Sequence, residues 1–121
     1  MTLFPELVST VLGESIIGRA QKNGIIDINV YNIRDYSEDK HKRVDDTTYG
    51  GGKGMLMMAP PIYNCYRAIA DRTVQGTETE KNSDGEYPPH KRRTIYMSPT
   101  GKVLTQQKAK ELSEYDELII L

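Results

Sequence analysis

The sequence has little cysteine, little net charge and no long apolar run, and each scarcity excludes a class of protein. Its single cysteine, Cys65, cannot form an intramolecular disulfide, which is typical of proteins from a reducing cytoplasm. Lys and Arg number 16 against 17 Asp and Glu, so the net charge is −1 and the molecule as a whole does not attract polyanions. Any contact with nucleic acid therefore requires a local basic patch.

The sequence also lacks the patterns of membrane insertion and export. No apolar run approaches the ~18 residues that a membrane-spanning helix needs. The N-terminus has no basic segment followed by an apolar one, so no signal peptide is indicated. We therefore expect a cytoplasmic protein without a membrane partner, and its 121 residues are one domain or part of one.

What is present is an alternation of helical and extended patterns. Apolar residues recur at helical spacing in four segments, namely 5–13, 15–24, 60–72 and 105–113. Short apolar or alternating runs typical of strands lie at 25–33, 94–99 and 117–121. Because strands that alternate with helices form parallel sheets with helices on their faces, the predicted fold class is α/β, a parallel sheet flanked by helices.

Two polar segments interrupt this pattern. Residues 34–55 have no apolar period and predict a long loop, and loops of this length in compact domains are usually functional or disordered. Residues 74–93 are polar and rich in turn formers, so they predict a mobile, solvated insertion.

The stretch YGGGKGM at 49–55 does not match a phosphate-binding motif. A P-loop needs G-x-x-x-x-G-K-[ST] after a strand, whereas here Lys53 is followed by Gly54 and no strand leads in. The dinucleotide fingerprint G-x-G-x-x-G is absent as well. The residues alone favour a tight backbone turn, with the methionines that follow serving in packing.

Two other segments carry residues that are able to do chemistry. In 40–46, His41 and Asp45 have the side chains of metal ligands or of an acid–base pair, although two residues are too few for a zinc site. A solvated loop is the alternative, and no metal site is predicted. The segment 96–101 follows a predicted strand, and α/β sheets bind ligands at the carboxyl ends of strands. The alternative interpretation of 96–101 is an ordinary turn from a strand to a helix.

Six motifs together resemble bacterial tRNA (guanine-37-N1)-methyltransferases, which belong to the knotted SPOUT class. These motifs are LFPE at 3–6, SIIGRA at 15–20, RDY at 34–36, HKRVDD at 41–46, YGGGKGMLMM at 49–58 and IYMSPTG at 95–101. The resemblance covers nearly the whole chain except 74–93. It implies transfer of a methyl group from S-adenosylmethionine to N1 of guanine 37 in tRNA, by a homodimer whose cofactor lies bent in a trefoil knot at the dimer interface.

The resemblance also assigns site residues. The first cofactor-binding loop of the family matches six consecutive residues, Tyr96, Met97, Ser98, Pro99, Thr100 and Gly101. A segment beside the active site, which helps to form the dimer, matches the loop that contains His41, Asp45, Tyr49, Gly50, Gly51, Gly52 and Gly54. Asp45 would be a supporting acid, and the glycines would permit close packing beside the cofactor pocket.

The family has further parts after the position of 117–121: a second cofactor loop, a catalytic arginine and aspartate, and a C-terminal domain that binds tRNA. None is in this sequence. We therefore expect 1–121 to be the N-terminal part of a SPOUT methyltransferase domain, truncated before the knot closes and inactive alone. The alternatives are an RNA-binding module, with 40–43 and 90–93 on RNA phosphates, and a structural fragment without a ligand.

Overall fold

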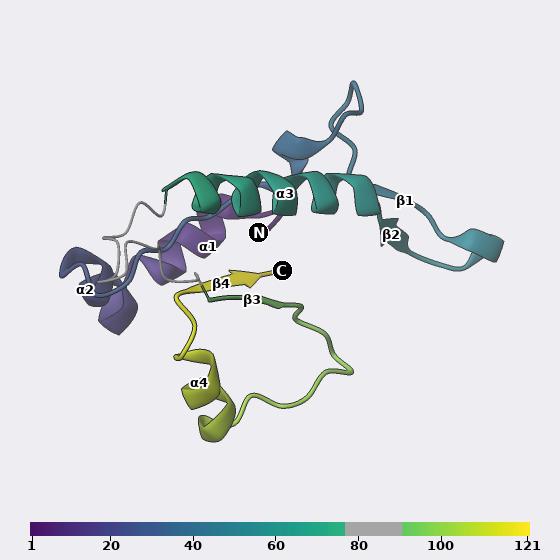
Figure 1. The fold of residues 1–121 in the computed structure, drawn as a ribbon. Coiled ribbons are helices and arrows are strands. Elements are labelled where there is room, and N and C mark those ends of the chain that lie inside the picture. Colours follow the sequence, from purple (N-terminus) through teal and green to yellow (C-terminus); the bar gives the residue numbers. More distant parts are fainter. Residues whose placement is uncertain (77–90) are drawn as a thin grey trace. The chain divides into compact units, whose positions relative to one another are not determined.

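The structure is a computed structural model, and it describes residues 1–76 and 91–121 of the chain (Figure 1). The described residues divide into two compact units, Met1–Ala68 and Ile69–Leu121. Each unit is considered by itself below.

Two short helices open the first unit, as the apolar spacing predicts. They are α1, Pro5–Leu12, and α2, Ser15–Lys22. Pro5 suits the first position of α1, because the N–H that proline lacks would have no partner inside the helix anyway. The N–H of Gly13 closes the helix by donating to the Ser9 carbonyl at 2.9 Å.

The two helices meet at Gly18, the buried residue of α2. A Cβ atom built on Gly18 would lie 1.9 Å from the carbonyl oxygen of Gly13. That oxygen belongs to the backbone and cannot move aside as a flexible side chain would. The close approach of α1 and α2 therefore depends on glycine at position 18.

The strand predicted at 25–33 is wrong. This segment has no ladder of hydrogen bonds, and an isolated parallel bridge joins Thr2 to Asn32. The N–H of Thr2 donates to the Tyr31 carbonyl at 2.9 Å, and the N–H of Ile33 donates to the Thr2 carbonyl at 3.0 Å. Alternation does not suffice for a strand, because the backbone N–H and C=O groups need partners along its whole length.

The long loop predicted at 34–55 contains four short elements. They are η1, Ile33–Tyr36, β1, Asp45–Thr47, η2, Tyr49–Gly51, and β2, Met55–Met57. The strands β1 and β2 pair antiparallel, with Asp45 opposite Met57 and Thr47 opposite Met55. Strands of three residues are too short to produce a visible apolar period, so the spacing of apolar residues could not reveal this hairpin.

The helix predicted at 60–72 is confirmed and is longer at both ends. It is α3, Ala59–Gly76, and Figure 1 shows the hairpin leading into its first turn. The most buried side chains of the first unit are Ile33, Val44 and Cys65, which are 2%, 0% and 0% exposed. Burial raises the pKa of the Cys65 thiol, which fits a packing role for this residue.

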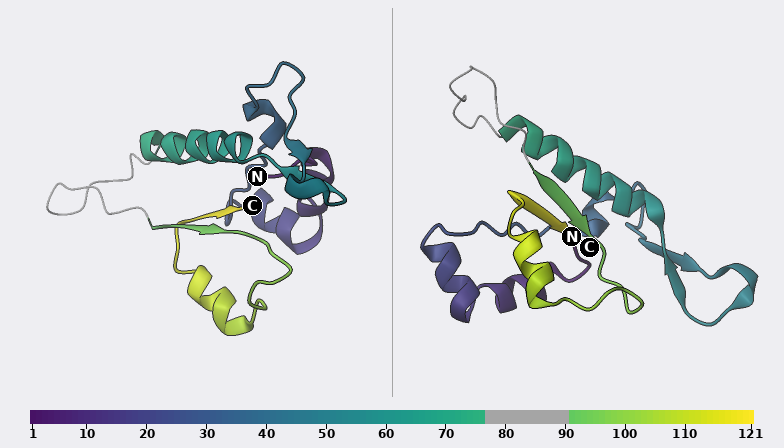
Figure 2. Two further views of the ribbon diagram at one scale, coloured as in Figure 1. Left: turned by 90° about the vertical axis from the view of Figure 1, so that its right-hand side faces the viewer. Right: turned by 60° about the horizontal axis from the view of Figure 1, so that its bottom comes forward.

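The second unit contains a parallel pair of strands, β3, Arg92–Ile95, and β4, Glu117–Ile120. They pair from Arg92 opposite Glu117 to Ile95 opposite Ile120, and both views in Figure 2 show them side by side. The helix α4, Gln106–Leu112, lies between them in sequence. Thr105, the first residue of the predicted helix, is its cap instead, because its Oγ1 accepts from the N–H of Lys108 at 3.2 Å.

The fold class is confirmed at the coarser level of a mixed α/β protein. In residues 1–76 and 91–121 the strands form two separate pairs, and one of these, β1 with β2, is antiparallel rather than parallel. The strand predicted at 94–99 begins earlier and ends at Ile95. No helix within the described ranges is long and apolar enough to cross a membrane.

The insertion predicted at 74–93 is wrong at its two ends. Residues 74–76 continue α3, and Arg92 and Arg93 belong to β3. The remainder of that prediction, at 77–90, lies outside the described residues.

Candidate functional site

The loop Tyr96–Gly101 follows directly from the carboxyl end of β3. The parallel ladder continues to its first residues, because the N–H of Leu121 donates to the Ile95 carbonyl at 2.9 Å and the N–H of Met97 donates to the Leu121 carbonyl at 2.8 Å. Pro99 has no N–H and cannot extend this ladder, so the chain leaves the sheet here. Tyr96 and Met97 remain 71% and 67% exposed, which leaves their side chains open to a ligand.

Ser98 and Thr100 hold the turn of this loop. The Ser98 hydroxyl accepts from the N–H of Thr100 at 3.3 Å and lies 3.1 Å from the Thr100 hydroxyl. The N–H of Gly101 donates to the Ser98 carbonyl at 3.1 Å. A Cβ atom on Gly101 would lie 3.1 Å from that same carbonyl oxygen, so the turn is tight at this residue. The result is an exposed, self-bonded loop at the position where α/β sheets bind ligands.

The glycine-rich segment forms the tip of the β1–β2 hairpin. Gly50, Gly51 and Gly54 have φ angles of 78°, 73° and 105°, which side chains rarely permit. The hydroxyl of Thr48 donates to the Gly52 carbonyl at 2.5 Å and closes the turn. No other heavy atom comes within 4 Å of a Cβ built on Gly50, Gly51 or Gly54, so these three glycines serve backbone conformation and not close packing within the described chain.

Tyr49 is 93% exposed at this tip, and Met55 and Leu56 on β2 are 60% and 48% exposed. The methionine packing that the residues alone favoured is therefore wrong for Met55. An exposed aromatic residue beside exposed apolar ones is typical of a surface that contacts another molecule.

The two adjacent carboxylates on β1 differ in their surroundings. Asp46 is exposed, and its carboxylate accepts from the N–H of Thr47 at 2.7 Å. Asp45 is half-buried beside Val44, whose carbonyl accepts from the N–H of Met58 at 2.7 Å. This backbone bond fixes Asp45 at the base of the hairpin, on an ordered element rather than in a free loop.

His41 lies on a turn that is held by another acidic residue, Asp39. The carboxylate of Asp39 accepts from the N–H of His41 at 2.7 Å and from the guanidinium of Arg43 at 3.1 and 2.9 Å. The hydrogen-bonded Arg43 guanidinium lowers the pKa of the Asp39 carboxyl to about 2. The Ser37 hydroxyl donates to the Arg43 carbonyl at 2.5 Å and completes the closure of the turn.

His41 and Asp45 do not form the acid–base pair that their proximity in sequence suggested. The His41 side chain is exposed on the turn, and no hydrogen bond joins it to Asp45 in the described part of the chain. Within residues 1–76 and 91–121, no group of three or more His, Cys, Asp or Glu side chains could hold a metal ion. The turn that carries His41 and the hairpin that carries Asp45 belong to the first unit, and Tyr96–Gly101 belongs to the second.

The Asp39–Arg43 pair was not found by the analysis of motifs. The sequence does contain an indication of this turn. An aspartate such as Asp39 often accepts hydrogen bonds from backbone N–H groups a few residues later, and this arrangement favours turns. The basic residues at the end of the predicted insertion were likewise assigned to solvent, although Arg92 is ion-paired with Glu117 and also donates to the Ala70 carbonyl at 3.2 Å.

Comparison with known proteins covers the whole chain. A family model described as tRNA (Guanine-1)-methyltransferase TrmD matches residues 1–121. The tRNA (guanine-N(1)-)-methyltransferase of Ruminiclostridium cellulolyticum is 54% identical over 121 residues, which are 100% of this chain and 46% of that protein. The protein of the same name from Alkaliphilus oremlandii is 48% identical over 121 residues, again 100% of this chain and 45% of that protein.

A solved structure agrees with this assignment. The crystal structure of tRNA (m1G37) methyltransferase from Aquifex aeolicus is similar to this chain with a TM-score of 0.71 and 28% identity, over 98% of this chain and 46% of that chain. This chain thus spans a little under half the length of the relatives it matches. Since the family match extends over all 121 residues, the chain belongs to the tRNA (Guanine-1)-methyltransferase TrmD family.

Proposed function

We propose that this chain is part of an enzyme that transfers a methyl group from S-adenosylmethionine to N1 of guanine 37 in tRNA. The observation that carries the proposal is the family match over residues 1–121, together with 54% identity to the Ruminiclostridium cellulolyticum enzyme. Because the chain spans 46% of that relative, the activity is assigned to a longer protein. The knotted SPOUT fold and the homodimer are assigned to the same longer protein.

Tyr96–Gly101 is the segment that we assign to the cofactor. It suits an adenosine group, because it lies at the carboxyl end of a parallel strand and exposes an aromatic and a thioether side chain, Tyr96 and Met97. Ser98 and Gly101 keep the loop tight, so its main-chain groups are held for hydrogen bonding to the adenine or the ribose. When bound, S-adenosylmethionine supplies the electrophilic methyl group.

The hairpin tip is the segment that we assign to the neighbourhood of the reacting guanine and to the dimer. Tyr49 is exposed there, and the left-handed backbone at Gly50, Gly51 and Gly54 leaves room for another backbone or a ligand. In this assignment a second copy of the protein covers the exposed apolar side chains of β2. The glycines then serve close approach to that copy and not the binding of a phosphate.

The reaction also needs a base, because guanine N1 loses its proton as the new bond to carbon forms. The family resemblance places the principal base outside residues 1–121. Asp45, which β1 holds at the base of the hairpin, is therefore assigned a supporting role, in which its carboxylate orients a basic partner or the loop over the guanine. The alignment of donor and acceptor supplies much of the remaining acceleration.

A chimera tests the proposal. Residues 1–121 of this chain replace the matching segment of the Ruminiclostridium cellulolyticum enzyme, and incorporation of labelled methyl groups is measured in a tRNA transcript with guanine at position 37. We expect methylation at a rate within tenfold of that of the parent enzyme. A transcript with adenine at position 37 is the control. A folded chimera that methylates neither transcript would contradict the proposal.

A further inference from the structure

The side chains of Arg92 and Glu117 form an ion pair across β3 and β4 at the first position of their parallel ladder. The Nε–H of Arg92 donates to the Glu117 carboxylate, and another N–H of the same guanidinium donates to the Ala70 carbonyl of α3 at 3.2 Å. The two side chains are mostly buried, at 18% and 22% exposed. One guanidinium therefore joins three elements at one point.

The apolar residues of the two strands do not fix their alignment. Ile119 is the one buried residue of 92–95 and 117–120, all of which the structure describes. A displacement of β3 against β4 by two residues keeps every side chain on its own face of the sheet. Thr94 then lies opposite Leu121, or Ile95 opposite Leu118, depending on the direction, so apolar side chains still meet. Burial alone therefore specifies the register weakly.

The ion pair does distinguish between these alignments. Each residue of a parallel strand spans about 3.3 Å, so a displacement by two residues carries the Glu117 carboxylate roughly 7 Å along β3. The guanidinium of Arg92 is also held by the Ala70 carbonyl, so following the carboxylate would break that bond. Either way a mostly buried charge loses a partner, which is unfavourable, and the fixing of registry is the best attested role of buried ion pairs.

The same alignment determines where the cofactor loop begins. The N–H of Leu121 donates to the Ile95 carbonyl at 2.9 Å, and the N–H of Met97 donates to the Leu121 carbonyl at 2.8 Å. These two bonds hold the chain as it enters Tyr96–Gly101. A displacement by two residues would move the loop by roughly 7 Å relative to β4, far more than a binding site tolerates.

We propose that the Arg92–Glu117 ion pair sets the register of β3 against β4 and thereby positions Tyr96–Gly101 for the cofactor. The identity of the cofactor as S-adenosylmethionine rests on the proposed function. Arg92 is a positioning residue, because it acts through the loop. Molecules with displaced strands cannot bind the cofactor, so loss of the pair lowers the apparent affinity by the fraction that remains aligned. Saturating cofactor selects the aligned molecules, so kcat is kept while KM rises.

NMR of the 121-residue chain tests the register directly, because scalar couplings across hydrogen bonds identify the acceptor of each N–H. In the parent chain we expect the Leu121 N–H to couple to the carbonyl carbon of Ile95. In Arg92→Gln we expect this coupling to weaken at least about twofold, with new couplings to the Arg93 or Met97 carbonyl, the acceptors after a displacement by two residues.

A role in stability alone would unfold some molecules and leave the couplings of the folded ones unchanged. Arg92→Lys keeps the charge and is expected to keep the parent coupling, and Glu117→Gln removes the other partner and should reproduce the effect of Arg92→Gln. The inference is overturned if folded Arg92→Gln retains only the parent coupling. It is also overturned if neither Arg92→Gln nor Glu117→Gln folds, because the pair would then serve stability.

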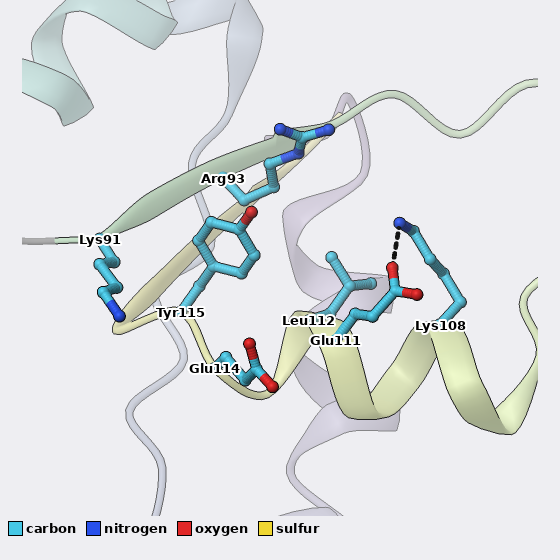
Figure 3. A pocket seen from close by; sticks show the side chains of 7 residues that line it. All are labelled: Lys91, Arg93, Lys108, Glu111, Leu112, Glu114 and Tyr115. Carbon is cyan, nitrogen blue, oxygen red and sulfur yellow. Dashed lines mark hydrogen bonds and ion pairs between the residues drawn. The ribbon is translucent and has the colours of Figure 1, made fainter.

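The chimera tests the consequence for the cofactor. Arg92→Gln is expected to raise the KM for S-adenosylmethionine about fivefold or more, as when one molecule in five remains aligned, with kcat within about twofold. Arg93→Gln is the matched control, since it removes the same charge from the next residue of β3, whose side chain lines a pocket with Lys108 and Leu112 of α4 (Figure 3). We expect it to keep the parent KM. An unchanged KM in folded Arg92→Gln overturns the positioning role.

The proposed function is tested separately from this inference. If the chimera methylates tRNA and the couplings of Arg92→Gln match those of the parent chain, the inference fails and the function stands. If the chimera does not methylate, the function fails, and the couplings of the 121-residue chain still decide whether the pair sets the register.

Discussion

At the scale of single residues, substitution of Asp45 is the strongest test of the candidate functional site. In the chimera, Asp45→Asn is expected to lower methyl transfer at saturating cofactor and tRNA by tenfold or more, which is about 1.4 kcal/mol of activation free energy. Loss of an interaction that forms only in the transition state lowers turnover with little effect on substrate affinity. Single-turnover incorporation of methyl groups measures this rate.

Asp46→Asn is the control for this substitution, because the neighbouring carboxylate is exposed and bonds to Thr47 next to it. We expect Asp46→Asn to keep the parent rate, and both variants to keep the melting temperature, since surface substitutions usually shift stability by under about 0.5 kcal/mol. A rate for Asp45→Asn within twofold of the parent would contradict a role for this carboxylate.

The turn around His41 gives a prediction about pH. The folded-state pKa of Asp39 is lowered to about 2, below the unfolded value, so the turn gains stability above about pH 4 that is lost as the pH falls toward 2. Carbon NMR of the Asp39 carboxyl is expected to show titration near pH 2. Arg43→Gln removes the guanidinium, which is the main cause of the shift, and should return the titration toward pH 4. An unchanged titration in this variant would contradict the assignment.

These residue-scale features differ in how far the sequence could predict them. The motifs led to Asp45 and to Tyr96–Gly101 through their resemblance to a family. The Asp39–Arg43 pair was missed, because it depends on the backbone of a turn in which Lys42 has a φ angle of 52°. Such left-handed conformations are uncommon for lysine, and no residue pattern in the segment indicates one.

At the scale of elements, the contact of α1 with α2 is the most sensitive to substitution. Gly18→Ala places a methyl group 1.9 Å from the Gly13 carbonyl oxygen, so the helices must separate. We expect a loss of about 1–3 kcal/mol in the free energy of unfolding, as for other overpacked sites, and urea denaturation measures it. The higher helix propensity of alanine opposes this by about 0.5–1 kcal/mol.

Gly24→Asn is a suitable comparison, because Gly24 has a φ of 67° with open space around it and asparagine tolerates such a conformation. Its effect on the free energy of unfolding is expected to be the smaller of the two. If Gly18→Ala were more stable than the parent, helix propensity would outweigh the clash, and the backbone contact would not limit the packing.

Whether an element could be predicted depends on its length and on how far away in sequence its hydrogen-bonding partners lie. The helices were predictable because their apolar residues repeat over two or more turns, and 117–121 because it is a continuous apolar run. The segment 25–33 alternates as a strand does, yet Ile25 is 72% exposed and a single bridge holds its end. Pairing depends on segments far away in sequence, which a local pattern does not contain.

At the scale of the whole molecule, the chain carries apolar surface that its own described residues leave uncovered. Leu7, Val11 and Ile16 in the first unit are 64–70% exposed, and Met97 and Leu104 in the second are each 67% exposed. Exposed apolar side chains on several elements are typical of surfaces that contact another molecule.

Weak cofactor binding is expected of the 121-residue chain by itself. With one of the two cofactor loops of the family in its sequence, the 121-residue chain is expected to bind S-adenosylmethionine weakly or not at all, because the enthalpy and the orientation of the ligand depend on both. Isothermal titration calorimetry measures the affinity, and the chimera serves as the positive control. A dissociation constant in the low micromolar range for the chain alone would contradict the expectation.

The parallel pairing of β3 with β4 also has a consequence for synthesis on the ribosome. Ile95 is made 22 positions before Glu117, the first residue of its partner strand. At a synthesis rate of about 5–20 residues per second, β3 remains without its partner strand for roughly one to four seconds. This is far longer than the pairing of two strands takes. During that interval its N–H and C=O groups are open to nascent chains on neighbouring ribosomes. Slow translation of 96–116 is therefore expected to increase the fraction of chains that aggregate before they fold.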